Sequence, residues 1–413
     1  TAYEISLGLV GSEMCIRDRS TSGCSENQIL DGYFLPWSNC WKLVGFDQSI
    51  ITLCKEPSFG GNAMKGVVFP GNQKLEIMDF QDPTPGPGEV VLEIKASGMC
   101  GSDLKFYRAE GGASSLGLGK LDGPIIAGHE PCGVVAAVGE GVPQEVAWEG
   151  MRVMQHHYRG CGYCEHCSTG WMQLCVDGVK DVYGVTAHGA HAKYMKCPAR
   201  TLVSLPDELS FKAGAAISCG TGNAWGALQR LRLRGDQTIA VFGQGPVGLS
   251  VTLLGSKMGA RVIALDVEEE RLQRAKEFGA DLLINPSTTE DVVQTIRDAT
   301  KSLGAHASMD CSSSPTARAQ AVQCVRTWGK ACFVGEGDTV TLNVSNDLLR
   351  RQVTIIGSWT FSNVGQAKCT EYIADKEISL DSLFTHEWQL EQAREAYELF
   401  DQQTSGKGVI LPS

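Results

Sequence analysis

The order of apolar and polar residues divides the chain into a strand-rich part and an alternating part. Between Thr238 and Gly357, short apolar runs alternate with stretches of helical periodicity. The run TIAVFG carries no charge, which is typical of a strand buried on both faces. Such alternation predicts an α/β fold with a doubly wound parallel sheet. The expected strands are TIAVFG, RVIALD, DLLIN, HASMDC, ACFVG and VTIIG, and the expected helices lie at 246–258, 268–278, 290–302 and 315–326.

Upstream of this part, the chain is rich in strands and turns. The segment 64–80 alternates apolar and polar residues and predicts two strands joined by a turn at 70–72. Further apolar runs at Val90–Gly98 and Cys132–Gly139 are separated by glycine and proline. This pattern favours a small β-barrel-like domain.

The remaining segments complete the predicted domains. The run AGAAISCGTGNAWGALQRL reads as a helix broken near Gly220–Gly222, and the chain after Gly357 is expected to be irregular except for a helix at 391–401. We expect this final segment to return to the first domain. The β-rich domain would then comprise residues 64–219 and 357–413, and the parallel-sheet domain residues 220–356.

Residues 1–63 differ from the rest of the chain. They show no periodicity that leads into the strands at 64–80, and they lack the basic and then apolar opening of a secretory signal. The segment Tyr3–Arg19 resembles a translated sequencing-adapter read. We therefore expect residues 1–63 to be a non-native or artefactual extension, with Met64 as the natural start. A genuine targeting or interaction segment is the alternative.

The net charge and the cysteines of the chain indicate which partners and which compartment to expect. The chain has 413 residues and a formal net charge of −11, which argues against nucleic acid or an anionic membrane as the main partner. No apolar run approaches the length of a membrane span. The 16 cysteines show no disulfide framework, which is typical of a reducing compartment and predicts a cytoplasmic location.

Four cysteines lie close together in the segment GCGYCEHCSTGWMQLC, with the spacing C-x2-C-x2-C-x7-C. They are Cys161, Cys164, Cys167 and Cys175. Four thiolates this close can surround one tetrahedral ion, and closed four-cysteine sites usually hold structural zinc. Disulfides between residues three apart are sterically awkward. An iron–sulfur cluster is the stronger alternative, because it also uses four thiolates.

A glycine-rich motif, GQGPVG, follows the strand TIAVFG and opens a helix. In this context G-x-G-x-x-G indicates a dinucleotide site, with the pyrophosphate at the helix N-terminus. The next strand ends at Asp266, where a carboxylate would accept hydrogen bonds from the ribose of NAD and repel the 2′-phosphate of NADP. Arg271 is the one feature that softens this preference. The expected cofactor-binding residues are Gly243, Gly245, Pro246, Val247, Gly248, Asp266 and Arg271.

Three more motifs stand outside these two sites: CGSD at 100–103, GHE at 128–130 and SCG around Cys219. Taken alone, each has a structural explanation, since cysteine is often a small buried residue. In their order with the four cysteines and the glycine motif, they resemble the medium-chain zinc-dependent alcohol dehydrogenase superfamily. The resemblance extends from about Met64 to the end of the chain. It implies a GroES-like catalytic domain, a Rossmann domain, two zinc ions per chain and NAD.

The resemblance also implies the roles of individual residues. Cys100, His129 and Cys219 would bind the catalytic zinc, and Glu130 would lie beside it. Asp103 would orient the ring of His129, and Ser102 would take the proton of the substrate hydroxyl. Many relatives complete a proton relay with a histidine three residues after Ser102. Lys105 stands at that position, and a lysine that keeps its proton at pH 7 relays protons poorly.

The substrate is less sharply indicated. His157, four residues before Cys161, is our candidate for a polar wall of the substrate pocket, although packing at a strand end would also explain it. A polar wall favours a diol, polyol or amino alcohol as the substrate of an alcohol dehydrogenase. Alternatives are a threonine- or polyol-type dehydrogenase, and a catalytically silent relative that binds a nucleotide. Family resemblance also implies a homo-oligomer, and leaves dimer and tetramer open.

Overall fold

We analysed a computed structural model that describes residues 40–43, 51–54, 63–112, 123–402 and 406–412. The chain forms two units, Thr1–Ser58 and Phe59–Ser413. In the first unit, strands β1 (Cys40–Leu43) and β2 (Ile51–Cys54) pair antiparallel. The rest of this unit lies outside the described residues, and so does most of the predicted extension 1–63. Its origin stays a prediction.

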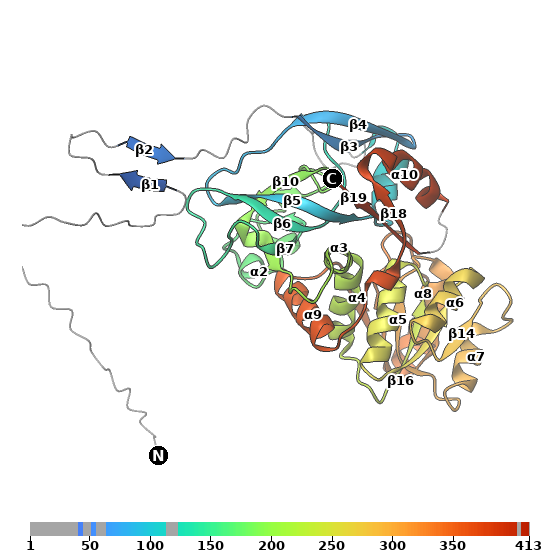
Figure 1. The fold of residues 1–413 in the computed structure, drawn as a ribbon. Helices are drawn as coiled ribbons and strands as arrows, with labels where there is room; N and C mark the ends of the chain where they lie inside the picture. The colour runs from blue at the N-terminus through green and yellow to red at the C-terminus, as the bar shows by residue number, and fades with distance from the viewer. Residues whose placement is uncertain (1–39, 44–50, 55–62, 113–122, 403–405, 413) are drawn as a thin grey trace, which may run out of the picture. The chain divides into compact units, whose positions relative to one another are not determined.

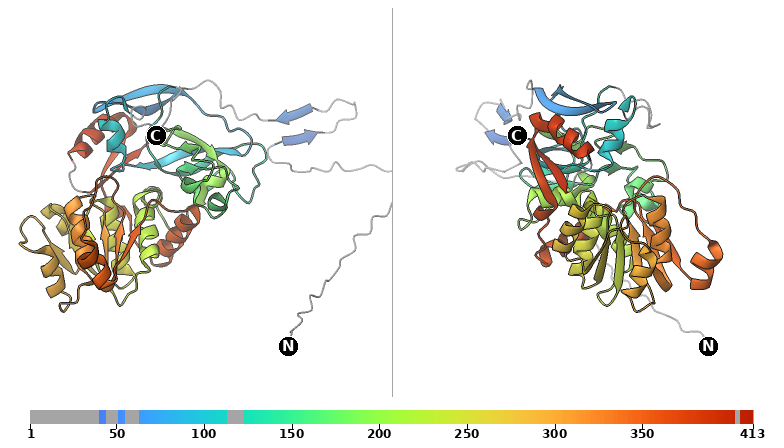
Figure 2. Two further views of the ribbon diagram at one scale, coloured as in Figure 1. Left: turned by 180° about the vertical axis from the view of Figure 1, so that it is seen from behind. Right: turned by 90° about the vertical axis from the view of Figure 1, so that its right-hand side faces the viewer.

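The alternating part of the second unit forms one six-stranded parallel sheet in the order β14-β13-β12-β15-β16-β17. Helices cover both of its faces (Figure 2). This arrangement confirms the predicted doubly wound sheet. The strands are β12 (Thr238–Phe242), β13 (Arg261–Leu265), β14 (Leu282–Ile284), β15 (Ala305–Asp310), β16 (Val325–Phe333) and β17 (Thr354–Gly357). The helices are α5 (Pro246–Lys257), α6 (Glu269–Glu277), α7 (Val292–Asp298) and α8 (Pro315–Gln323).

The strand-rich part forms a second, mainly antiparallel sheet in the order β11-β7-β6-β5-β19-β18, with β10 also paired to β5. Its strands are β5 (Glu89–Gly98), β6 (Glu130–Val138), β7 (Arg152–Gln155), β10 (Tyr194–Pro198), β11 (Leu202–Ser204), β18 (Phe384–Gln389) and β19 (Lys407–Leu411). Two small antiparallel pairs accompany it: β3 (Ala63–Gly71) with β4 (Lys74–Gln81), and β8 (Tyr158–Arg159) with β9 (Asp181–Val182). Strands β18 and β19 come from the end of the chain, so the C-terminal segment completes this antiparallel sheet.

Helices outside the parallel sheet are mostly short. They are α1 (Asp103–Arg108), α2 (Glu165–Ser168), α3 (Phe211–Ile217), α4 (Gly220–Leu231), α9 (Asn363–Asp375) and α10 (Ala393–Asp401). Single turns complete the set: 3₁₀ helices η2 (Met172–Leu174), η3 (Ala199–Thr201), η5 (Leu349–Arg351), η6 (Asp381–Leu383) and η7 (Leu390–Gln392), and the π-helix η4 (Val344–Leu348). In the described part of the chain, none of the helices combines the length and apolarity needed to cross a membrane.

The structure corrects the sequence-based elements at three places. Helix α9 and strands β18 and β19 occupy a segment expected to be irregular. The Ser362 hydroxyl accepts from Gly365 N to cap α9, which packs against α3 and α4 (Figure 1). The break between α3 and α4 falls at Ser218–Cys219 rather than at Gly220–Gly222. The turn of the first hairpin lies at Asn72–Gln73, where both residues adopt positive φ, rather than at 70–72.

Candidate active site

The four cysteines of the C-x2-C-x2-C-x7-C segment surround one point. The ligand atoms of Cys161, Cys164, Cys167 and Cys175 all lie within 4.8 Å of one another. The Sγ–Sγ distances are 3.9 Å for Cys161–Cys167 and 4.0 Å for Cys164–Cys175. Four sulfurs about 2.3 Å from one zinc ion would be about 3.8 Å apart, so the set fits a single tetrahedral ion. All four cysteines are free, and a multi-iron cluster would hold them farther apart.

Backbone amides around this cluster favour thiolates. The N–H groups of Cys161, Cys164 and Cys167 donate to sulfur atoms of the cluster, at 3.3, 3.4 and 3.5 Å. The backbone N–H of Cys167 lowers the pKa of Cys164 to about 6. Burial raises the pKa of Cys167 to about 12, and a bound metal would displace the proton of that thiol. The donor set therefore suits the structural zinc expected from the sequence.

A second cluster forms from residues far apart in the sequence. Cys100 follows β5, His129 and Glu130 stand at the start of β6, and Cys219 lies between α3 and α4. Their ligand atoms lie within 4.8 Å of one another, with 3.7 Å between Cys100 Sγ and Cys219 Sγ. A hydrogen bond from the Cys219 thiol holds the pKa of Cys100 well below its usual range. Two sulfurs and one imidazole are the donors of a catalytic zinc site that keeps one open position.

Ser102 and Asp103 lie against this cluster. The Ser102 hydroxyl donates to Cys100 Sγ at 3.2 Å, and its oxygen lies 3.1 Å from His129 Nε2. Asp103, 1% exposed, accepts from His129 Nδ1 at 2.8 Å. A carboxylate at Nδ1 leaves Nε2 free to face a metal.

Glu130 has a partner that the sequence did not reveal. Lys407, from β19, lies 2.6 Å from Glu130 Oε2, and both side chains are buried. Lys407 also donates to the carbonyl of Met99 at 3.0 Å. Glu130 Oε1 has no hydrogen-bond partner within the described part of the chain. Burial raises the pKa of Glu130 to about 8, which marks how costly a free charge would be there. The unpartnered oxygen beside three metal-binding donors fits a carboxylate poised next to a metal.

His157 lies beside the second cluster. Its ring centre is 5.2 Å from that of His129 and 6.3 Å from that of Phe361. The residue is 3% exposed, and its Nδ1 has no partner among the described residues. Burial lowers the pKa of His157 well below its usual value, so the ring is neutral near pH 7. The neighbouring His156 instead contacts the carbonyl of Phe361, at 3.0 Å.

The glycine motif lies between β12 and α5. Gly243 adopts φ +88°, which a side chain would strain, and a Cβ at Gly248 would meet the oxygen of Gly243 at 1.8 Å. A Cβ at Gly245 would meet nothing within 4 Å, so space is left beside the N-terminus of α5. Pro246 and Val247 begin that helix. Open space at the positive end of a helix suits a pyrophosphate.

Asp266 follows β13 and faces the same loop. Its carboxylate accepts from Gln244 N at 2.6 Å and from Glu268 N at 3.0 Å. Arg271 Nη1 lies 3.8 Å from it. Asp266 thus holds the glycine-rich turn in place, and it retains further lone pairs for a ligand.

Lys105 points to the loop that follows β16. Its Nζ lies 2.5 Å from Glu336, and both side chains are substantially exposed, at 47% and 61%. It therefore joins α1 to the parallel-sheet part of the chain.

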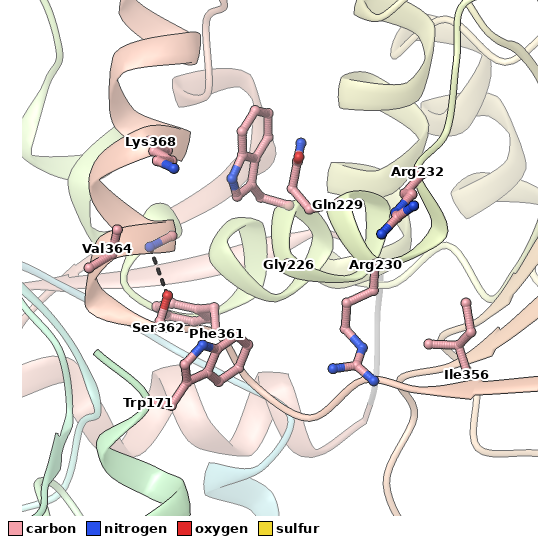
Figure 3. A pocket seen from close by; sticks show the side chains of 12 residues that line it. Trp171, Gly226, Gln229, Arg230, Arg232, Ile356, Phe361, Ser362, Val364 and Lys368 are labelled. Atoms are coloured by element: carbon pink, nitrogen blue, oxygen red, sulfur yellow. Dashed lines mark hydrogen bonds between the residues drawn. The ribbon is translucent and has the colours of Figure 1, made fainter. Parts of the chain in front are cut away.

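A cavity of about 500 Å³ lies between α4 and α9, apart from the residues predicted as sites. Figure 3 shows Arg230, Trp171 and Ile356 around it. Phe361 forms part of its wall and also contacts the rings of His156 and His157. Phe361 is therefore shared by this cavity and by the aromatic group that includes His156 and His157.

Comparison with known proteins agrees with this geometry. Residues 86–207 match the alcohol dehydrogenase GroES-like domain, and residues 246–375 match the zinc-binding dehydrogenase domain. A zinc-type alcohol dehydrogenase-like protein of Escherichia coli K12 is 37% identical over 84% of this chain and 98% of its own length. A sorbitol dehydrogenase of Bacillus subtilis is 31% identical, over 81% and 93%.

Similarity extends to solved structures. An alcohol dehydrogenase of E. coli CFT073, complexed with NADH, superimposes with a TM-score of 0.75 at 26% identity, covering 85% of this chain and 100% of that one. Fold, metal-binding clusters and overall sequence therefore agree: the chain belongs to the medium-chain zinc-dependent alcohol dehydrogenase superfamily.

Proposed function

We propose that this oxidoreductase transfers hydride from a polar alcohol, such as a diol, polyol or amino alcohol, to NAD and gives a ketone or aldehyde. The observation that carries the proposal is the convergence of Cys100, His129 and Cys219 with Ser102 beside them. When bound, zinc supplies Lewis acidity toward the substrate hydroxyl, and the nicotinamide supplies the hydride acceptor.

Within this function, the side chains hold and move protons. Ser102 Oγ would accept the proton of the substrate hydroxyl and pass it on, and its distance of 3.1 Å from His129 Nε2 supports this role. Asp103 keeps the proton of His129 on Nδ1. Lys407 pairs with Oε2 of Glu130, and Oε1 has no hydrogen-bond partner among the described residues. The site thereby enters each turnover with its donors already oriented.

The polar part of the substrate would meet His157. A buried ring nitrogen without a partner is costly, and a second hydroxyl or an amino group of the substrate would supply that partner. The sorbitol dehydrogenase relative acts on a polyol, which supports the same substrate class. The threonine- or polyol-type assignment is a narrower form of this proposal.

NAD rather than NADP is the cofactor that Asp266 favours. Its carboxylate at the end of β13 would repel a 2′-phosphate, and Glu268 to Glu270 add negative charge in the sequence beside it. Arg271 neutralises part of that charge. The NADH complex of the E. coli CFT073 relative supports the choice.

We also propose the domain boundaries, the location and the oligomeric state. Residues 64–219 and 357–413 would form the catalytic domain and residues 220–356 the nucleotide domain, in a cytoplasmic homodimer or homotetramer. The exposed edge strand β17, with Ile355 38% exposed, is the surface through which nucleotide domains would associate.

The test is NADH formation by the full chain across simple alcohols, diols, sugar alcohols and threonine, each with NAD and with NADP. Turnover of the polar alcohols with NAD is expected. Turnover of plain alcohols alone would contradict the proposed contact of His157 with a polar substrate. A preference for NADP would contradict the proposed selection of NAD by Asp266. His157→Phe provides the matched variant: it should lose polar substrates while keeping the aromatic packing against Phe361.

A further inference from the structure

A chain of buried hydrogen bonds extends from the proposed metal ligand His129 into the core of the barrel-like domain. The Asp103 carboxylate accepts from His129 Nδ1 at 2.8 Å on one oxygen. Its other oxygen accepts from Cys100 N at 2.9 Å and from the Tyr397 hydroxyl at 3.2 Å. The hydroxyl of Tyr397 lies 2.7 Å from His191 Nε2, and His191 Nδ1 lies 2.8 Å from Ser97 Oγ.

The members of this chain come from separate segments and are all shielded from water. Ser97 belongs to β5, Asp103 to α1 and Tyr397 to α10, while His129 precedes β6 and His191 precedes β10. Ser97, His191 and Tyr397 are 0% exposed. Because bulk water cannot replace any of these bonds, each group depends on its neighbour in the chain.

Only one arrangement of protons satisfies every contact. Asp103 is an acceptor, so the Tyr397 hydroxyl donates its single proton to it and must itself accept from His191. His191 therefore carries its proton on Nε2. Burial lowers the pKa of His191 to about 4, so its ring is neutral near pH 7 and Nδ1 accepts from the Ser97 hydroxyl. At the other end, Asp103 accepts the Nδ1 proton of His129, so Nε2, which lies 3.1 Å from Ser102 Oγ, is the ring nitrogen left for a metal.

We propose that Tyr397 and His191 are positioning residues, which fix the Asp103 carboxylate and through it the His129 tautomer that can bind the catalytic metal. The inference rests on the proposed role of His129 as a ligand. Both side chains are held by packing. The ring of Tyr397 meets that of Phe69 edge-on, with 4.8 Å between the ring centres. A Cβ at Gly128 would lie only 2.5 Å from His191 Nδ1. Glycine before His129 thus leaves the space that the imidazole of His191 fills.

The test compares zinc retention in Tyr397→Phe and Tyr107→Phe. Both substitutions remove one hydroxyl from the same aromatic cluster, since the two rings lie 5.8 Å apart, but no hydrogen bond joins the Tyr107 hydroxyl to the chain described above. Zinc bound per full chain is measured during challenge with a chelator. In Tyr397→Phe one zinc should leave about 10-fold faster than in the wild type, while the zinc of the four cysteines stays. Tyr107→Phe should match the wild type.

A second variant pair tests the other end of the chain. His191→Leu should behave like Tyr397→Phe, and His191→Gln, whose amide can still donate to Tyr397, should recover part of the retention. If Tyr397→Phe does not fold, this pair still tests whether the hydrogen-bond chain positions His129. Equal zinc loss in both tyrosine variants, or wild-type retention in Tyr397→Phe and in His191→Leu, would overturn the inference. A wild-type chain that holds only one zinc would instead contradict the proposed function itself.

Discussion

At the scale of single residues, Lys105 departs from the relay expected in this superfamily. The structure pairs it with Glu336 at the surface, where an ion pair contributes about 0–1 kcal/mol. Lys105 therefore links α1 to the loop after β16. The proton of the substrate would leave through Ser102 and solvent instead.

We therefore expect Lys105→Ala to keep the pH dependence of kcat/KM and to change kcat by less than about 3-fold. The measurement is a pH–rate profile of NADH formation. Lys95→Ala, which removes a comparable exposed pair with Glu93, is the control. Loss of one limb of the profile in Lys105→Ala alone would show that the lysine does relay protons.

Residue-level prediction from sequence worked where short motifs carry the chemistry. Cys100, Ser102 and Asp103 share one motif, and His129 and Glu130 share another. Lys407, His191 and Tyr397 were missed, because their partners lie in remote segments. A lone lysine or tyrosine gives no sign in the sequence that it will meet a buried carboxylate. The only available signal was the return of the C-terminal segment to the first domain.

At the scale of elements, two glycines of the turn between β12 and α5 have different roles. A Cβ at Gly248 would collide with the Gly243 carbonyl, whereas a Cβ at Gly245 would enter open space. Gly248 therefore allows the helix to pack closely against the strand, and Gly245 leaves room for the pyrophosphate.

Gly245→Ala should therefore leave the free energy of unfolding within about 0.5 kcal/mol of the wild type and raise the KM for NAD about 10-fold or more. Gly248→Ala should lower the free energy of unfolding by about 1–3 kcal/mol, because backbone must shift. Chemical denaturation and steady-state kinetics measure the two effects. A Gly245→Ala enzyme with unchanged KM would mean that the cofactor lies elsewhere.

Element prediction from sequence failed where tertiary contacts decide. Helix α9 begins with Asn363, Val364 and Gly365, which all have low helix propensity, and its segment was expected to be irregular. In the structure it is stabilised by the Ser362 cap and by burial of Cys369 and Ile373 against neighbouring helices. The central strands β12 and β13 of the parallel sheet were predictable because each is a nearly continuous apolar run.

At the scale of the whole molecule, the second unit brings residues from both ends of its sequence into one site. Strand β19 pairs with β5, which places Lys407 behind Glu130. The two metal-binding clusters lie in separate parts of the strand-rich segment, one in the cysteine lobe and one between β5, β6 and α4. The chain is therefore expected to bind two metal ions, one structural in the cysteine lobe and one catalytic at the second cluster.

The most direct test of this claim is the zinc content of the full chain and of Cys219→Ala, measured together with NADH formation from a polar alcohol. We expect two zinc atoms per wild-type chain. Cys219→Ala should hold one and lose activity, whereas Cys324→Ser, in a core away from both clusters, should keep two zincs and activity. One zinc per wild-type chain, or full activity in Cys219→Ala, would contradict the account.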